Sequence, residues 1–404
     1  MAADAPNTSV LRGLLVLDMT QALAGPYLTM LLGDLGADVI KVERPGDGDQ
    51  SRGWGPPFAG SESSYYMAVN RNKRSLTCDL KTAEGLEILR RLTDRADLIV
   101  TNERRQATRQ QMGFDYETVR GRNPGVVYCS ITGYGMTGPY AGQPGYDAVA
   151  QAMSGLMSIA GNEDWPPMRV PASIADMATA MYGVMAVLAA LLARQTITPG
   201  QGQYIDLSLL ESHAWWTIIQ SAAYLLNGHL PRKLGNEHPS IVPYGAFQAA
   251  DGYLIIGCAS ESLWASLCRV LDLGPVRDDP RFAINRDRVL NRAEINAIIE
   301  ERLSAGSVAQ WCAVLGKASI PSCPIYTIPE MLSDPQTAAR GFVVAQEHPT
   351  AGTLRTLACP IHLSETPAEL RLPPPLLGEH TDEVLRELGY RADESAAVHA
   401  GGAV

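Results

Sequence analysis

The sequence lacks most of the short motifs that identify an enzyme class by themselves. The glycines near its start do not form the GxGxxG turn of a dinucleotide site, and the chain has neither a Walker phosphate-binding loop nor a GxSxG nucleophile elbow. No histidine precedes His213, and none of the seven histidines belongs to an HExxH pair. We therefore expect no resident metal and no permanently bound cofactor, and a serine hydrolase has little support.

Paired cysteines and an excess of positive charge are also missing. The seven cysteines are scattered without a CxxC pair, which fits reduced thiols in a cytoplasmic protein rather than a disulfide framework. Acidic residues (43) outnumber basic ones (33), and the net charge of −10 argues against nucleic-acid binding. Between residues 41 and 124, however, Lys and Arg are in excess. This local basic segment favours a small anionic ligand.

Signals for a membrane are weak as well. The first residues lack the basic and apolar regions of a signal peptide. The most apolar run extends from Ala178 to Ala193, which is shorter than the ~20 residues that a bilayer requires. We therefore expect a buried core helix there and no membrane span.

The pattern of apolar residues predicts an α/β protein. Short runs rich in Leu, Val and Ile read as buried strands and alternate with amphipathic stretches that read as helices. This alternation is typical of a parallel sheet covered by helices. The predicted strands are 14–19, 38–43, 97–102, 125–131 and 203–210, and the predicted helices include 24–36 and 82–96.

A change of pattern near residue 225 predicts a second, smaller domain of the α+β type. A hairpin with Asp-Gly at its turn is expected over 242–257, followed by helices over 261–273 and 293–306. The Pro-rich link 372–378 precedes a segment that we expect to return to the first domain. The predicted division is 1–224, 225–325 and 326–404.

Asp176 is the residue with the strongest case for chemistry. It lies at the start of an almost wholly apolar helix, in the segment RVPASIADMATAMYG (169–183). One interpretation is a helix N-cap that accepts backbone N–H groups. The other is a carboxylate kept ionised by the positive end of the helix dipole, which makes it a nucleophile toward a bound thioester.

Seven segments, in order, make the chain resemble the class III CoA-transferase family, also called the formyl-CoA and carnitine-CoA transferase family. Together they cover nearly the whole chain. They are VLDMTQALAGP (16–26), GADVIKVERPGDGDQSRGWGPPF (36–58), NRNKRSLTCDLKTAEG (70–85), GFDYETVRGRNPGVVYCSITGYGMTGPY (113–140), GYDAVAQAMSGLM (145–157), SIADMATAMYG (173–183) and LLGEHTDEVLRELG (376–389).

The resemblance implies a fold and a mechanism. Family members have a Rossmann-like large domain built from both ends of the chain, a small central domain, and two chains that form interlocked rings. Asp176 matches the aspartate that attacks the acyl-CoA and forms first a mixed anhydride and then an aspartyl-CoA thioester. Acyl-CoA and small carboxylic acids are therefore the expected substrates, and a homodimer the expected assembly.

The resemblance also implies residues that contact CoA. Basic side chains among them suit the phosphates of CoA. After Asn102 the sequence departs from the family pattern, with one additional residue before Met112, so the contacts of that loop differ in detail. The implied set is Gln21, Ala22, Leu23, Ala24, Arg44, Lys73, Arg74, Asn102, Arg104, Gly133 and Tyr134.

Within the family, the stretches 145–157 and 235–244 resemble the branch that exchanges CoA between succinyl-CoA and glutarate, itaconate or malate. The second carboxylate of such an acid needs a cation or several hydrogen-bond donors, because a buried unpaired charge is costly. The predicted substrate-binding residues are Arg52, Trp54, Arg169 and His238.

Two alternatives stay open at this point. The family also contains 2-methylacyl-CoA racemases, which carry a histidine where this chain has Tyr146. A tyrosine is a poor proton shuttle at neutral pH, so the racemase is the second choice. The third hypothesis is a CoA-binding protein without catalysis.

Overall fold

The structure is a computed structural model that describes residues 9–404, and it divides the chain into two compact units. Unit 1 comprises residues up to Leu156, Arg169–Leu225 and Ala338–Val404, so both ends of the chain belong to it. Unit 2 comprises Met157–Met168 and Leu226–Thr337. Each unit has its own core and is described by itself.

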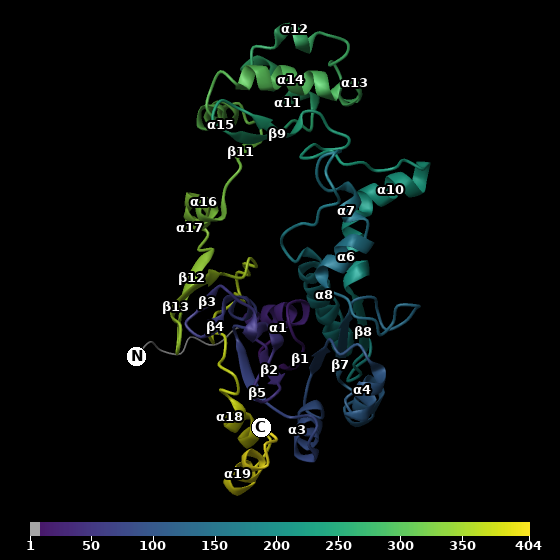
Figure 1. The fold of residues 1–404 in the computed structure, drawn as a ribbon, viewed down its shortest axis with the longest axis vertical. Coiled ribbons are helices and arrows are strands. Elements are labelled where there is room, and N and C mark those ends of the chain that lie inside the picture. The colour runs from purple at the N-terminus through teal and green to yellow at the C-terminus, as the bar shows by residue number, and fades with distance from the viewer. Residues whose placement is uncertain (1–8) are drawn as a thin grey trace. The chain divides into compact units, whose positions relative to one another are not determined.

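Unit 1 is built on a six-stranded parallel sheet, as the alternation of apolar runs predicted (Figure 1). The strand order is β5-β2-β1-β6-β7-β8, so the chain adds strands on one side of β1 and then crosses to the other side. The strands are β1 (Leu15–Met19), β2 (Asp38–Glu43), β5 (Lys73–Thr77), β6 (Leu98–Thr101), β7 (Val127–Thr132) and β8 (Tyr204–Ser208). We did not predict β5 from the sequence, because Lys73 and Arg74 at its start were interpreted as contacts for CoA.

Helices cover both faces of this sheet because successive side chains of each strand point to opposite sides. Val16 packs with α1 and α8 on one face, whereas Leu17 packs with α3 and α18 on the other. The helices of unit 1 are α1 (Ala24–Asp34), α2 (Ser64–Ala68), α3 (Ala83–Thr93), α4 (Gln106–Gln111), α5 (Tyr116–Arg122), α6 (Asp147–Met153), α8 (Ile174–Thr196), α9 (Leu209–Ala214), α18 (Thr381–Glu387) and α19 (Ala392–Ala400).

Unit 1 also contains short turns and hairpins, and three short helices span its boundaries with unit 2 along the chain. The 3-10 turns are Gln50–Gly53 and Trp215–Thr217, and two hairpins pair β3 (Phe58–Ala59) with β4 (Glu62–Ser63) and β12 (Val343–His348) with β13 (Gly352–Leu357). Three helices cross the boundary between the units in sequence: α7 (Leu156–Ile159), α10 (Ile218–Asn227) and α17 (Pro335–Ala339).

Helix α8 is longer than the apolar run that predicted it. Among residues 9–404 it is the one helix long and apolar enough to cross a membrane by length and composition. Half of its most apolar stretch is buried inside the protein, where it packs on α1, α9 and the sheet. This burial is that of a core helix in a folded domain.

Unit 2 has a three-stranded antiparallel sheet of order β11-β10-β9, with Asp251-Gly252 in the turn between β9 and β10. Trp264, Leu267 and Ile299 are among the buried side chains that form its core. Its elements are β9 (Tyr244–Gln248), β10 (Tyr253–Gly257), α11 (Glu261–Val270), α12 (Gly274–Arg277), α13 (Asn285–Leu290), α14 (Arg292–Leu303), α15 (Val308–Lys317), β11 (Ser322–Pro324) and α16 (Ile328–Ser333).

Candidate active site

A cavity of about 970 Å³ lies in unit 1 at the carboxyl ends of the sheet strands. It is lined by the loops that follow β1 and β6, the two neighbouring strands from which the chain runs to opposite sides of the sheet. Because these two loops diverge, an open α/β sheet has its binding crevice at this switch point. The cavity therefore lies where this strand order favours a ligand site.

Two glycines bring a further loop to the cavity. A Cβ atom on Gly133, just after β7, would lie 2.8 Å from Cα of Gly145, and one on Gly145 would lie 2.7 Å from Cα of Gly133. The two backbones can cross at this distance because neither residue has a side chain. The crossing places Tyr146 and Asp147 at the cavity wall.

Asp147 positions the first turn of α8, where Asp176 lies. The N-cap residue of α8, Ser173, makes no side-chain cap hydrogen bond, and Asp147 Oδ1 instead accepts the backbone N–H of Ala175 at 2.8 Å. Asp147 Oδ2 accepts Nε2 of Gln151 at 2.7 Å. Asp176 is the third residue of the helix, so the prediction that it caps the helix is wrong. Asp147 supplies the cap from another helix.

Asp176 faces the cavity in a poorly solvated position. Burial, and then the nearby charge of Asp147, raise its pKa from the ordinary 3.8 to about 7. This desolvation disfavours the charged form and opposes the helix dipole, which the sequence-based interpretation expected to keep Asp176 ionised. A carboxylate with a raised pKa is a stronger nucleophile once ionised, which suits attack on an activated carbonyl.

Aromatic side chains form the wall beside Asp176. The ring of Trp54 meets that of Tyr65 edge to face, with centroids 4.9 Å apart, and both residues line the cavity. Burial, followed by the charge of Asp176, raises the pKa of Tyr65. Its phenol is therefore a neutral hydrogen-bond donor at physiological pH.

Most of the predicted site residues lie around this one cavity. The loop after β1 contributes four of them, and the loops after β2, β6 and β7 contribute the others near the sheet. Those that line the cavity are Gln21, Ala22, Leu23, Ala24, Arg44, Trp54, Asn102, Arg104, Gly133, Arg169 and Asp176.

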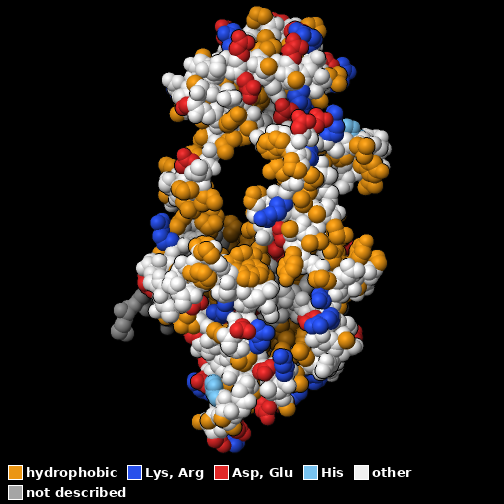
Figure 2. Space-filling view, in the orientation of Figure 1, with side chains coloured by type: hydrophobic (Ala, Val, Ile, Leu, Met, Phe, Trp, Pro, Cys, Tyr) orange, Lys and Arg blue, Asp and Glu red, His pale blue; other side chains and the backbone are white. Residues whose placement is uncertain are grey.

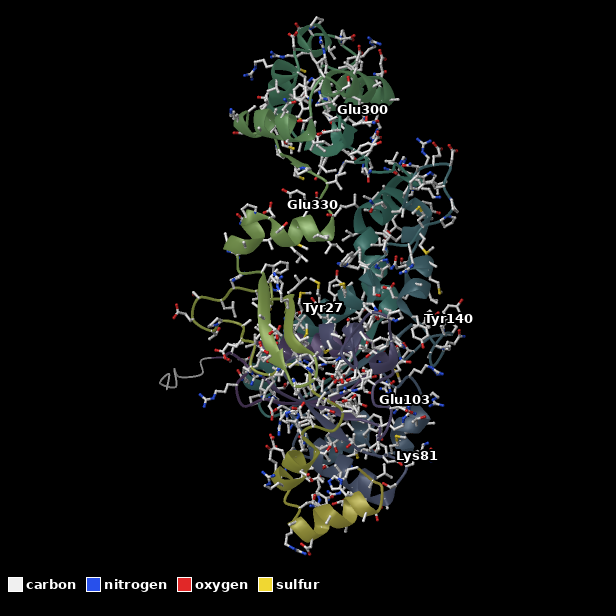
Figure 3. The ribbon with its side chains drawn as sticks, turned by 60° about the vertical axis from the view of Figure 1, so that its left-hand side comes forward. Tyr27, Lys81, Glu103, Tyr140, Glu300 and Glu330 are labelled. Atoms are coloured by element: carbon white, nitrogen blue, oxygen red, sulfur yellow. The ribbon has the colours of Figure 1, made fainter. Side chains whose placement is uncertain are left out.

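The sequence reasoning missed Lys81, Tyr65 and Asp147 as members of the site. Lys81 follows β5 and lines the same cavity as Glu103, which follows β6; Figure 3 labels both side chains. A strand assignment for residues 73–77 would have placed Lys81 at the carboxyl end of a parallel strand, where a ligand contact is expected.

The structure does not place Lys73 and Arg74 at the cavity. The ammonium of Lys73 is fully buried and donates to Asp18, Asn70 and the carbonyl of Pro26. Arg74 forms ion pairs with Asp38, Glu383 and Glu387. The donors of both cations are already used inside the protein, so the structure gives no support to the predicted contact with CoA phosphates.

The hydrogen-bond donors of Arg52 are also used by groups of the protein itself. Its guanidinium binds both oxygens of Glu43 at 2.7 and 2.8 Å and donates to the hydroxyl of Tyr66 and the carbonyl of Pro375. It does not line the cavity. The structure therefore gives no support to the prediction that Arg52 contacts a substrate carboxylate.

Two further predicted residues lie elsewhere than on the cavity wall. Tyr134 packs against Tyr140, with ring centroids 5.5 Å apart, and does not line the cavity. His238 belongs to unit 2, where its ring stacks on Tyr244. Burial and the charge of Arg292 lower the pKa of His238, so its ring is neutral near pH 7 and is a poor cation for a carboxylate.

Comparison with known proteins gives consistent matches. A family model described as CoA-transferase family III matches residues 11–381. The chain is 41% identical to succinate–glutarate CoA-transferase of Agrobacterium fabrum, over 95% of this chain and 97% of that protein. It is 40% identical to succinyl-CoA:glutarate CoA-transferase of Homo sapiens, over 98% and 89%. The crystal structure of a CAIB/BAIF family protein from Brucella suis superposes with a TM-score of 0.83 at 39% identity, covering 94% of this chain and 99% of that one.

Proposed function

Because the chain belongs to CoA-transferase family III, we propose that it moves coenzyme A from an acyl-CoA to a small carboxylic acid through covalent intermediates on Asp176. The observation that carries the proposal is the position of Asp176, a desolvated carboxylate with a pKa of about 7 in a large cavity at the switch point of the sheet. The proposed donor is succinyl-CoA, and the proposed acceptor is a dicarboxylate such as glutarate, itaconate or malate.

The reaction balances without ATP or a metal ion. A carboxylate oxygen of Asp176 attacks the thioester carbonyl, the C–S bond breaks, and CoA leaves as a thiolate. The thiolate attacks Cγ of Asp176, and cleavage of the anhydride releases the donor acid. The acceptor carboxylate then attacks Cγ and displaces the thiolate, which attacks the new acyl carbonyl and restores the Asp176 carboxylate. Each step exchanges one activated carbonyl for another of similar energy.

The surroundings of Asp176 support this chemistry. Three cations on the cavity wall, Arg44, Lys81 and Arg104, give the pyrophosphate and 3′-phosphate of CoA partners of opposite charge. The aromatic wall of Trp54 and Tyr65 keeps water from the anhydride, which hydrolysis would waste. The phenol of Tyr65 can donate a hydrogen bond to oxygen atoms that gain charge near Asp176.

Arg169 is the proposed partner of the acceptor's second carboxylate. It lines the cavity, and its side chain is exposed, with one hydrogen bond to the carbonyl of Pro171. The guanidinium is therefore free to bind a carboxylate. The names of the relatives support this substrate class, because the proteins of Agrobacterium fabrum and Homo sapiens are glutarate transferases.

A panel assay tests the proposal. The purified protein is incubated with succinyl-CoA and, in separate reactions, with glutarate, itaconate, malate, acetate or butyrate, and the new thioester is identified by mass. We expect a new thioester with at least one dicarboxylate and little with the monocarboxylates. Equal rates with acetate and glutarate would contradict the dicarboxylate proposal and leave the transferase proposal standing.

The same material separates the alternatives. A 2-methylacyl-CoA of fixed configuration incubated with the protein would epimerise if the chain were a racemase. Tyr146 lines the cavity and is 61% exposed, in the place where racemases of the family carry histidine. We expect no epimerisation, because that reaction needs a second proton carrier opposite Asp176. If the protein catalysed neither transfer nor epimerisation, the hypothesis of a CoA-binding protein without catalysis would be favoured.

We also propose that two copies form the interlocked homodimer expected from the family. One side of α8 carries exposed apolar residues at helical spacing, namely Met177, Met181, Met185, Leu188 and Leu192, each 37–60% exposed. Figure 2 shows a second apolar group over α10, where Ile218, Ile219, Tyr224 and Leu225 are exposed. Apolar surface of this extent is normally covered by another chain.

A further inference from the structure

The loop of residues 20–23, which joins β1 to α1, forms one wall of the active-site cavity and has an unfavourable backbone conformation. Ala22 has a φ of 70°, in the left-handed region. This region is unfavourable for a non-glycine residue, so such a residue persists only where the surrounding structure holds it.

Three side chains from outside the loop hold successive residues of it. Lys41 donates to the carbonyl of Thr20 at 2.8 Å. Asn102 accepts the N–H of Gln21 at 3.3 Å and donates to its carbonyl at 2.9 Å. Asp49 accepts the N–H of Ala22, the strained residue, at 3.1 Å.

Asp49 is itself fixed by buried partners. It is 1% exposed, its Oδ2 lies 2.9 Å from the ammonium of Lys41, and its Oδ1 also accepts the N–H of Ser51 at 2.9 Å. Lys41 and Asp18 are both fully buried and lie 3.9 Å apart. Ions this deep are kept in place by their counter-ions, because an unpaired buried charge is costly. The ion group thus gives Asp49 a fixed position from which to hold Ala22.

We infer that Asp49 is a positioning residue for the proposed CoA transfer, acting through the N–H of Ala22. By keeping Ala22 in its left-handed conformation, Asp49 sets the position of the 20–23 loop, the wall beside the proposed thioester site, relative to Asp176. Displacement of such a wall by about 1 Å reduces the rate of a reaction that depends on alignment. The inference rests on the proposed function for its kinetic consequence, and on the contacts above for the loop itself.

Three variants separate positioning from stability. Asp49→Ala removes the acceptor of the Ala22 N–H. Asp34→Ala is the matched control, because Asp34 is equally buried, lies at the other end of α1 and binds Arg71 at 2.7 Å, yet does not touch the loop. Asp49→Ala combined with Ala22→Gly tests rescue, since glycine adopts a φ near 70° without strain.

We expect both alanine variants of the aspartates to lower the melting temperature. Only Asp49→Ala should lower kcat, by about 10-fold or more, with a smaller change in KM for the acyl-CoA. The glycine substitution should restore part of that kcat without restoring stability. Equal kcat in Asp49→Ala and the unmodified enzyme, or an equal loss in Asp34→Ala, would overturn the inference.

If Asp49→Ala does not fold, Ala22→Val provides the second test. A β-branched residue is disfavoured at this φ, while the buried ions stay paired. We expect a lower kcat and a lower melting temperature, with a larger loss of kcat than Asp34→Ala shows at a similar loss of melting temperature. An unchanged kcat, or an effect on KM alone, would count against the inference.

Amide hydrogen exchange makes the test independent of the reaction. Residues 20–24 should exchange faster in Asp49→Ala than in Asp34→Ala, whatever substrates the enzyme uses. If the unmodified protein shows no transfer but this exchange difference is present, the proposed function fails and the role of Asp49 in holding the loop remains. If transfer is present and exchange is unchanged, the inference fails alone.

Discussion

Asp176 is unusual among the carboxylates of this protein because the fold disfavours its charge. Its pKa rises from 3.8 to about 7 through burial and then through Asp147. Between these pH values the folded protein binds more protons than the unfolded chain, so stability falls as pH rises through this window and is constant above about 7. The ionised state that the proposed reaction requires of Asp176 therefore lowers the stability of the folded protein.

Substitution of Asp176 by Asn should abolish transfer and stabilise the protein. We expect kcat to fall by at least about 10³-fold, since the nucleophile is lost. Above pH 7 the free energy of unfolding should rise by up to about 4 kcal/mol, because the ionised, desolvated group is gone. Denaturation at pH 8 and pH 4 measures this, and the gain should vanish at pH 4. A covalent adduct trapped on another residue would contradict the assignment.

The pH dependence of kcat/KM should show an acid limb near pH 7, because Asp176 must be ionised to attack. Asp147→Asn keeps an acceptor for the Ala175 N–H but removes the charge, so the limb should move to lower pH. The movement should be less than about one unit, since burial is the larger cause of the raised pKa. Gln151→Leu is the control: it removes the hydrogen bond to Asp147 and leaves the charge. A limb that moves equally in both variants would refute the electrostatic role of Asp147.

Arg169→Ala should change which acids are used rather than whether transfer occurs. With the guanidinium gone, KM for glutarate should rise about 10-fold or more, while KM for a monocarboxylate should change little. Arg44→Ala serves as the matched control, because Arg44 lines the same cavity and should affect KM for succinyl-CoA instead. If KM rose equally for glutarate and for a monocarboxylate in Arg169→Ala, Arg169 would not be the partner of the second carboxylate.

At the scale of elements, the site depends on loops that cross where glycines permit it. Gly145→Ala would put a methyl group 2.7 Å from Cα of Gly133, so one of the two loops must move. We expect a loss of about 1–3 kcal/mol in stability and a lower kcat, because Tyr146 and Asp147 follow directly. Gly121→Ala is the control, since a methyl group there meets nothing within 4 Å. Melting temperature and kcat are measured for both variants. If both fall only in Gly145→Ala, the close approach of the two loops is the cause; if both fall equally in Gly121→Ala, the exchange of glycine for alanine is itself the cause.

At the scale of the whole molecule, the exposed side of α8 predicts the assembly. We expect a dimer by sedimentation even at nanomolar concentration, because interlocked chains cannot separate without unfolding. Met181→Lys with Met185→Lys should reduce dimer formation, since both residues are more than half exposed in the single chain. Val10→Lys adds a charge at an exposed apolar residue away from α8 and should have no effect. A monomer in the unmodified protein would contradict the proposal.

Much of the fold was predictable because it depends on local sequence. The strands 38–43 and 98–101 are short runs of β-branched and aliphatic residues, and the apolar side chains of α1 and α8 follow helical spacing. Burial on both faces of a parallel sheet favours such clusters of Val, Ile and Leu, even though the strand 38–43 also carries three charged residues. The family motifs around Asp176 then led to the prediction that this residue is the nucleophile.

The strand Lys73–Thr77 shows where local reading fails. It begins with two cations, which is typical of a surface or a phosphate site, yet all of its residues except Thr77 are buried. Lys73 is neutralised by Asp18, 55 residues earlier, and Arg74 by Glu383, 309 residues later. Since the strand was missed, Lys81 at its carboxyl end was missed as well.

The sheet, the helices that cover it and the family could be read from the sequence, because each depends on local periodicity or on motifs in order, and the same motifs led to the proposal of Asp176 as the nucleophile. Only the tertiary structure decided which charges are free to meet a ligand. Arg44, Arg104 and Arg169 reach the cavity, whereas Arg52 binds Glu43 and Lys73 binds Asp18 inside the protein. The availability of a charge depends on its counter-ions and its exposure to solvent, and both are set by residues that come together only when the chain folds.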